Sequence, residues 1–134
     1  MADKTKKKYW EGIGRRKTSS ARVRIYEGST SSTVNGKPLE VLYPEEIDQD
    51  VVLKPFVVTG TKSKMYFTAK VKGGGKSGQR DSISLGIARA LAKISESNSI
   101  SLKKESLLTR DPREVQRKKY SFVKSRKKPQ FSKR

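Results

Sequence analysis

Residues 64–83, KMYFTAKVKGGGKSGQRDSI, contain a strand pattern, a run of glycines and the start of a helix pattern. The strand pattern covers residues 64–72, where an apolar residue occurs at every second position. Its inward-facing residues are Met65, Phe67, Ala69 and Val71. The helix pattern has apolar residues at Ile83, Ile87, Ala90, Leu91 and Ile94, with Asp81 or Ser82 as the expected cap. We therefore expect a sheet covered by a helix, joined to it by a glycine-rich loop.

Other patterns predict the remaining elements. They are a strand at 21–27, a turn at Asn35-Gly36, a short helix opening at Pro44, a helical stretch at 102–108, a helical turn at 110–119 and an extended end at 120–134. Strands with a helix packed across them predict an α+β fold, a two-layer sheet-and-helix domain with a long extended basic C-terminal tail. We place a basic N-terminal extension at 1–7, one globular domain at 8–108 and the tail at 109–134.

The charge of the chain is strongly positive and concentrated at its two ends. The 134 residues include 32 Lys and Arg against 13 Asp and Glu, for a net charge of +19. Residues 1–24 carry nine cations and two acids, and residues 110–134 carry eleven cations and two acids. Residues 39–58, by contrast, hold five acids and one lysine. Basic ends around a milder centre are typical of arms that bind a polyanion.

The chain lacks the residue types that several functions require. Without Cys or His, it has no disulfide, no thiolate catalysis and no usual zinc site. No apolar run approaches the ~20 residues of a membrane span, and no secretory signal is recognisable, so we expect a soluble intracellular protein. The acids at 45–50 have no companion base, so we expect no catalytic residue, metal site, cofactor or small-molecule substrate.

The glycine loop invites comparison with nucleotide-binding loops. A Walker A loop needs a glycine five residues before the Gly of its Gly-Lys pair, and Lys70 stands there. A dinucleotide loop needs a second strand ending in an acid about 20 positions on, where Glu96 instead ends a helix pattern. Two interpretations stay open: a plain turning connection, or a cradle in which bare backbone N–H groups hold a phosphate. Nearby cations favour a nucleic-acid phosphate.

Three further segments are rich in cations. Residues 12–17 repeat the glycine-plus-cation scheme, residues 109–119 space cations along one helical face, and residues 124–134 end with Pro129 and Phe131 among cations. The first segment is also compatible with a solvated charge run, and the last with disorder in the isolated protein.

Six motifs in order resemble one family, the ninth small-subunit ribosomal protein in its bacterial or organellar form. They are Gly12-x-Gly-Arg-Arg-Lys17 with Ala21-Arg-Val, Val71 to Gln79, Gly86 to Leu91, Leu108 to Asp111, Arg117 to Lys119, and Pro129 to Arg134. The chain departs from the family pattern at Ser84, Ser121 and Ser125, where Arg, Gly and Ala are common. The resemblance implies that Ser84 removes one rRNA contact and that Ser121 makes the bend into the tail less permissive.

The resemblance also implies a structural, non-enzymatic role on a cytoplasmic or organellar ribosome. Expected partners are the head (3′ domain) of small-subunit rRNA, P-site tRNA and neighbouring proteins of the subunit head. The expected rRNA-binding residues are Arg15, Arg16, Lys17, Arg22, Lys72, Gly73, Gly74, Gly75, Lys76, Gln79, Arg80, Arg110, Arg113, Arg117, Lys118, Lys119, Arg126, Lys127 and Lys128. The expected tRNA-binding residues are Ser132, Lys133 and Arg134. A free architectural nucleic-acid binder and a nucleotide enzyme are the rival hypotheses.

Overall fold

A computed structural model describes residues 7–132. Its elements in chain order are β1 (Trp10–Arg16), β2 (Ser19–Glu27), β3 (Thr33–Val34), β4 (Lys37–Pro38), α1 (Leu39–Leu42), α2 (Glu46–Thr59), β5 (Met65–Lys72), α3 (Lys76–Ala92) and α4 (Glu96–Lys104). The strands form one mixed sheet in the order β1-β2-β5-β3-β4, in which only β3 and β5 pair in parallel. The expected α+β class is confirmed.

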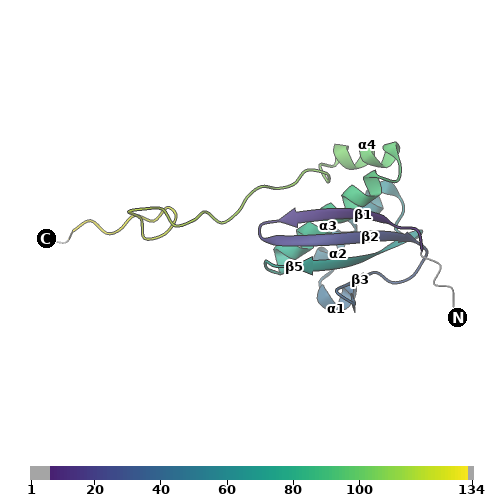
Figure 1. The fold of residues 1–134 in the computed structure, drawn as a ribbon, viewed down its shortest axis with the longest axis horizontal. Helices are drawn as coiled ribbons and strands as arrows, with labels where there is room; N and C mark the ends of the chain where they lie inside the picture. The colour runs from purple at the N-terminus through teal and green to yellow at the C-terminus, as the bar shows by residue number, and fades with distance from the viewer. Residues whose placement is uncertain (1–6, 133–134) are drawn as a thin grey trace.

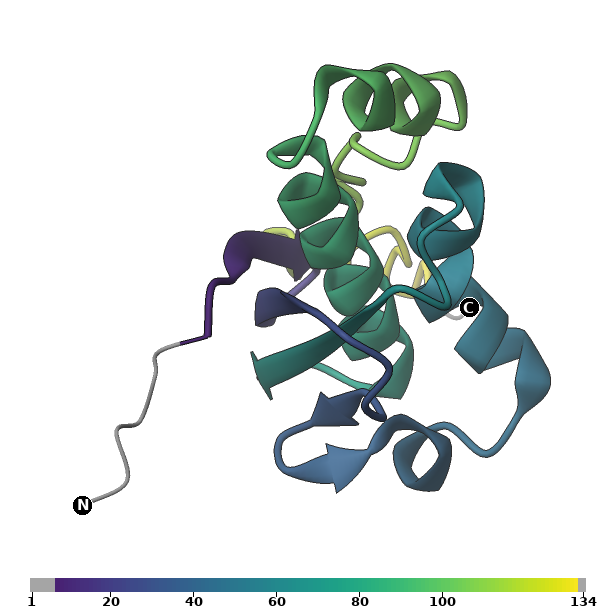
Figure 2. The ribbon, with the colours of Figure 1, turned by 90° about the vertical axis from the view of Figure 1, so that its right-hand side faces the viewer.

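The helices lie on one side of the sheet (Figures 1 and 2). Helix α3 crosses β1 and β2, and α2 packs beside α3, with Phe56 of α2 stacked on Phe67 of β5 at 6.0 Å between ring centroids. The core contains the inward residues of β2 and β5 and the sheet-facing residues of α3. They are Ala21, Val23, Ile25, Phe67, Ala69, Val71, Ile83, Ile87, Ala90 and Leu91. The alternation predicted for β2 and β5 is therefore confirmed.

Helix α3 lies unusually close to β1 because glycines remove the side chains between them. A Cβ on Gly12 would lie 2.2 Å from the carbonyl oxygen of Gly86, and a Cβ on Gly14 would lie 1.8 Å from that of Ser82. A Cβ on Gly86 would in turn meet Val23 at 2.7 Å. Gly12 and Gly14 thus face the helix, and their function is close backbone packing and not the approach of a phosphate.

Several predicted elements have different bounds in the structure. Strand β1 was not expected, since the two glycines that face α3 interrupt its apolar alternation. The short helix expected to open at Pro44 is α2, which begins at Glu46 and runs for 14 residues through Pro55. Helix α3 begins at Lys76 with Gly75 as its N-cap, so the expected caps Asp81 and Ser82 are wrong.

The chain beyond α3 also differs from expectation. The second helical stretch is α4 at Glu96–Lys104, capped by the side chain of Ser95, and not 102–108. Residues 110–119 form no helix, so Arg110, Arg113 and Arg117 do not share a helical face. Residues 109–132 form neither helix nor strand, and Figure 1 shows this segment running away from the sheet and helices. None of the helices within residues 7–132 is both long and apolar enough to cross a membrane.

Candidate nucleic-acid interface

The face of the sheet opposite α3 carries rows of cations, and Figure 1 shows β1, β2 and β5 in front of that helix. Strand pairing aligns Arg15 with Ser20 and Ser20 with Lys72 in one row. The next row aligns Ile13, Arg22 and Lys70. All six side chains are exposed. Arg22 and Lys70 are direct cross-strand neighbours, a like-charge arrangement that destabilises a sheet unless an acid or another anion offsets the charges.

These two rows line a shallow depression that we call the basic sheet face. Its volume is about 410 Å³, and its lining consists of Ile13, Arg15, Ser20, Ala21, Arg22, Lys70 and Lys72. The lining holds four cations and no acid, together with the Ser20 hydroxyl. Guanidinium groups bind phosphate oxygens in pairs, and lysines add point charges. The basic sheet face therefore suits a phosphodiester backbone.

The basic sheet face is bounded along the strands by a row that contains an acid. Glu11 lies 3.3 Å from the Nε of Arg22 and 3.7 Å from the Nε of Arg24, which neutralises part of the charge there. Beyond this row, Tyr26 stacks on Tyr66 at 5.4 Å between ring centroids, which leaves Tyr66 8% exposed. The anion-binding capacity is thus concentrated at the end of the sheet nearest the β1–β2 turn.

That turn contains Lys17, which is exposed and has a left-handed backbone at φ 52. It lies next to the glycine loop. Gly73 and Gly74 have positive φ values of 75 and 66, and a Cβ on Gly74 would lie 1.9 Å from the hydroxyl of Ser19. The Ser19 hydroxyl donates a hydrogen bond of 2.9 Å to the Gly73 carbonyl oxygen. These two glycines therefore serve the local fold.

The first turn of α3 is the part of the loop that suits an anion. Gly75 has an ordinary φ of −95, and a Cβ placed on it would meet nothing within 4 Å. As the N-cap it supplies no side-chain hydrogen bond, and the first turn contains no acid. The N–H groups at the start of a helix attract anions. Gln79 donates a hydrogen bond to the Gly73 carbonyl oxygen at 3.1 Å, so its side chain stabilises the conformation of the loop.

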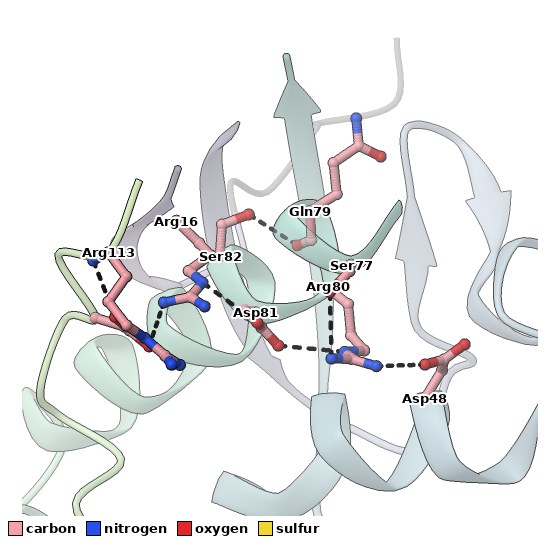
Figure 3. A network of polar contacts seen from close by, with 9 residues as sticks. Arg16, Asp48, Ser77, Gln79, Arg80, Asp81, Ser82 and Arg113 are labelled. Carbon is pink, nitrogen blue, oxygen red and sulfur yellow. Dashed lines mark hydrogen bonds and ion pairs between the residues drawn. The ribbon is translucent and has the colours of Figure 1, made fainter. Parts of the chain in front are cut away.

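Other predicted rRNA-binding residues belong to a chain of ion pairs that runs from α2 to the C-terminal segment (Figure 3). Arg80 donates to Asp48 at 2.7 Å and to Asp81 at 3.2 Å. Asp81 lies 3.6 Å from the Nε of Arg16. The pKa of Arg80 is raised above its ordinary value, chiefly by the hydrogen bond to Asp48; burial lowers it by less, and the hydrogen bond to Asp81 raises it further. Lys76 lies 3.8 Å from Asp48 and is turned toward α2.

The same chain of ion pairs continues to Asp111. Arg16, whose side chain is 12% exposed, forms an ion pair with Asp111 through Nη1. Arg113 donates to the same carboxylate from its side chain at 2.8 Å and from its backbone at 3.0 Å. These contacts hold the pKa of Asp111 well below its usual range, with the Arg113 hydrogen bonds as the largest cause. Arg16, Arg80 and Arg113 are thus already paired with acids, and their contact with rRNA stays a prediction.

The remaining cations at 109–132 are exposed, except for the half-buried Arg110, which lies 3.7 Å from Glu114. The exposed ones are Arg117, Lys118, Lys119, Lys124, Arg126, Lys127 and Lys128. Residues 119–127 form a loop with two backbone hydrogen bonds, one of 3.2 Å from the Phe122 N–H to the Lys119 carbonyl oxygen and one of 2.8 Å from the Val123 N–H to the Lys127 carbonyl oxygen. Ser121 has a φ of 64 in this loop, which explains why glycine suits that position. Ser132 is exposed, and Lys133 and Arg134 lie outside the described residues.

Sequence reasoning missed part of the basic sheet face. Lys70 belongs to an outward row of the basic sheet face but was not predicted as a ligand, although the alternation of β5 already placed it outward. Ser84, expected to mark a lost rRNA contact, is 9% exposed and donates to the Val51 carbonyl oxygen at 3.0 Å. Its side chain therefore joins α3 to α2.

The four cations in the depression on the sheet are typical of the class of polyanion-binding proteins. In residues 7–132 no group of three His, Cys, Asp or Glu residues is placed to hold a metal ion. A family model described as "Ribosomal protein S9/S16" matches residues 14–134. The small ribosomal subunit protein uS9 of Gloeothece citriformis (strain PCC 7424) is 46% identical over 127 residues, which cover 94% of this chain and 92% of that protein.

The chain therefore belongs to the ribosomal protein S9 family, as the sequence motifs indicated. Its members are structural, non-enzymatic proteins of the small ribosomal subunit, with rRNA and other ribosomal proteins as partners.

Proposed function

We propose that this chain binds the head (3′ domain) of small-subunit rRNA through its basic sheet face and the first turn of α3. The observation that carries the proposal is the depression of about 410 Å³ with four cations and no acid. The cross-strand pair of Arg22 and Lys70 supports it, because this pair is stabilised once a phosphate lies between the two charges. The first turn of α3 supplies N–H donors for a second phosphate.

The second part of the proposal concerns residues 109–134, which we assign as a basic tail that contacts P-site tRNA at Ser132, Lys133 and Arg134. Residues 8–108 act as the rRNA-binding domain, and residues 1–7 as a basic extension. The ion pair of Arg16 with Asp111 supports this division, because it fastens the beginning of the tail to the domain. The site of action is a ribosome in the cytoplasm or in an organelle.

The rRNA contact is tested by replacing the cross-strand neighbours Arg22 and Lys70 with uncharged residues. The double variant Arg22→Gln/Lys70→Gln is compared with Lys54→Gln/Lys103→Gln, which removes the same charge from exposed positions on α2 and α4. Filter binding to a transcript of the rRNA 3′ domain is measured over a series of salt concentrations. The first variant should reduce the slope of log affinity against log salt by about two, one for each lost phosphate contact. Equal slopes for the two variants would contradict the proposal.

A further inference from the structure

The outer surface of α2 is apolar and exposed. Val52 and Phe56 on its inner side are fully buried, yet Ile47 is 72% exposed and Val57 is 60% exposed. A helix with large apolar residues on every side is normally covered on every side. The outer surface of α2 is therefore suited to contact with another molecule.

This surface is hollowed. A depression of about 430 Å³ lies on it, lined by Ile47, Asp50, Val51, Leu53, Lys54, Val57 and Lys62. It lies on α2, whereas the basic sheet face is on the opposite side of the sheet from α3. Its lining is mostly aliphatic, so it accepts an aliphatic or aromatic side chain better than a phosphate.

The charge around the depression distinguishes the classes of partner. Residues 39–58 contain five acids and one lysine in a chain with a net charge of +19. Asp48 is buried against Arg80, and the other four acids, Glu40, Glu45, Glu46 and Asp50, are exposed. Lys54 and Lys62 line the depression together with Asp50, so the lining itself has no excess of acids, and the further acids are Glu45 and Glu46, just before Ile47 in the chain. An RNA backbone would be repelled by them, whereas a basic polypeptide would be attracted.

We propose that the outer surface of α2 docks a basic segment of another protein of the small subunit. The segment places an apolar side chain in the depression between Ile47 and Val57, and its cations lie near Glu46 and Asp50. The proposal rests on the ribosomal role of the chain but not on its rRNA or tRNA contacts. It gives the domain two opposite surfaces, one for RNA and one for protein.

Site-specific photo-crosslinking tests the identity of the partner. A benzoylphenylalanine at position 47 is compared with one at position 70 on the basic sheet face, each in purified small subunits assembled with the full chain. Position 47 should cross-link to a lysine- and arginine-rich peptide of a second ribosomal protein, identified by mass spectrometry, and position 70 to rRNA. A cross-link from position 47 to rRNA or to this chain's own tail would overturn the proposal, as would the absence of any protein cross-link from incorporated chain.

A pair of polar substitutions tests the apolar part of the contact. Ile47→Ser/Val57→Ser alters two exposed side chains and so leaves the core intact, and Val115→Ser, at a residue that is 90% exposed, is the control. In competition with wild type for assembly, the double variant should be disfavoured roughly tenfold, and equally in low and high salt, because apolar contacts do not depend on charge. Equal incorporation of the double variant and the control would overturn the proposal. Failure of the unmodified chain to enter subunits would overturn the ribosomal role as well.

Discussion

Arg16 of β1 forms an ion pair with Asp111, the residue at which the C-terminal segment leaves the domain. Arg16 is held in turn by Asp81 of α3, and Asp111 is held by Arg113. One arginine of the sheet thus contacts both the covering helix and the beginning of the tail. These ion pairs hold the beginning of the C-terminal segment against β1 and α3.

Replacing Asp111 should release the beginning of the tail. Asp111→Asn keeps the size of the side chain and removes the charge that pairs with Arg16 and Arg113. Trypsin should then cleave within residues 110–119 several-fold faster, because the open state is more populated. Glu114→Gln is the control, since Glu114 lies on the same segment but pairs only with Arg110, at 3.7 Å. Equal cleavage of both variants would show that Asp111 does not anchor the tail.

The pH dependence of this effect has a definite sign. The folded-state pKa of Asp111 lies below its ordinary value, so its contribution is present at neutral pH. That contribution is lost as the pH falls below about 4 toward the lowered value, because the carboxyl is then protonated. The difference in cleavage between Asp111→Asn and wild type, measured with an acid-active protease, should narrow over that range.

The glycines between β1 and α3 should be intolerant of a methyl group. Gly14→Ala would place Cβ 1.8 Å from the Ser82 carbonyl oxygen and 2.6 Å from the Gly86 nitrogen, both of which are backbone atoms. The helix would have to move off the sheet, at a cost of at least about 2 kcal/mol. Urea denaturation measures the loss, and Gly75→Ala is the matched control. A change below about 0.5 kcal/mol for Gly14→Ala would contradict the close packing described for β1.

Gly75→Ala should weaken the binding of rRNA by the glycine loop without lowering the stability of the fold. Gly74→Val would be a poorer probe, because φ is 66 at Gly74 and its Cβ would meet Ser19. Gly75 has free space around it and an ordinary φ, so its alanine variant should fold normally. A methyl group at the helix start should weaken binding to the rRNA 3′ domain about tenfold, the equivalent of one charged hydrogen bond. Unchanged affinity would remove the first turn of α3 from the proposed interface.

Deleting Ser132–Arg134 should affect tRNA and not assembly. These residues end in two cations and a carboxylate, and Arg134 can bind a phosphate in a bidentate manner that a lysine cannot reproduce. Truncated subunits should assemble normally and lose P-site tRNA roughly tenfold faster, with a difference that widens as salt is lowered. Arg134→Lys should show part of the effect. Truncated subunits that fail to assemble, or that hold tRNA as wild type does, would contradict the division of roles.

The elements that could be predicted from the sequence are those whose apolar side chains recur at strand or helix spacing. Val23 and Ile25 alternate with polar residues, and Ile83, Ile87 and Leu91 recur at helical spacing, so β2 and α3 could be expected. Strand β1 could not, because Gly12 and Gly14 occupy its inward positions and leave no apolar signal. The predicted turn at Asn35-Gly36 was confirmed, with φ values of 52 and 80. It was predictable because Asn and Gly are the residue types that most readily adopt the positive φ that this turn requires.

The sequence predicted most of the cations of the candidate site, but not which of them lie side by side on one surface. Arg22 and Lys70 become neighbours only through the β2–β5 register, which no local pattern encodes. In the same way, the sequence gives no sign that Arg16 and Arg80 are paired with acids from distant elements. The glycine loop was located correctly, but the sequence does not distinguish its glycines. Gly73 and Gly74 pack against neighbouring residues, whereas the position of a Cβ on Gly75 is open.

Lysine reactivity in the complex of the full chain with a transcript of the rRNA 3′ domain tests the basic sheet face most directly. Acetylation with a water-soluble reagent, followed by mass spectrometry, compares Lys70 and Lys72 with Lys54 and Lys103, all of which are exposed in the free chain. Lys70 and Lys72 should be protected roughly tenfold in the complex, since a phosphate-bound ammonium group is sequestered from the reagent, while Lys54 and Lys103 react as in the free protein. Protection of Lys54 and Lys103, with Lys70 and Lys72 as reactive as in the free chain, would contradict the account.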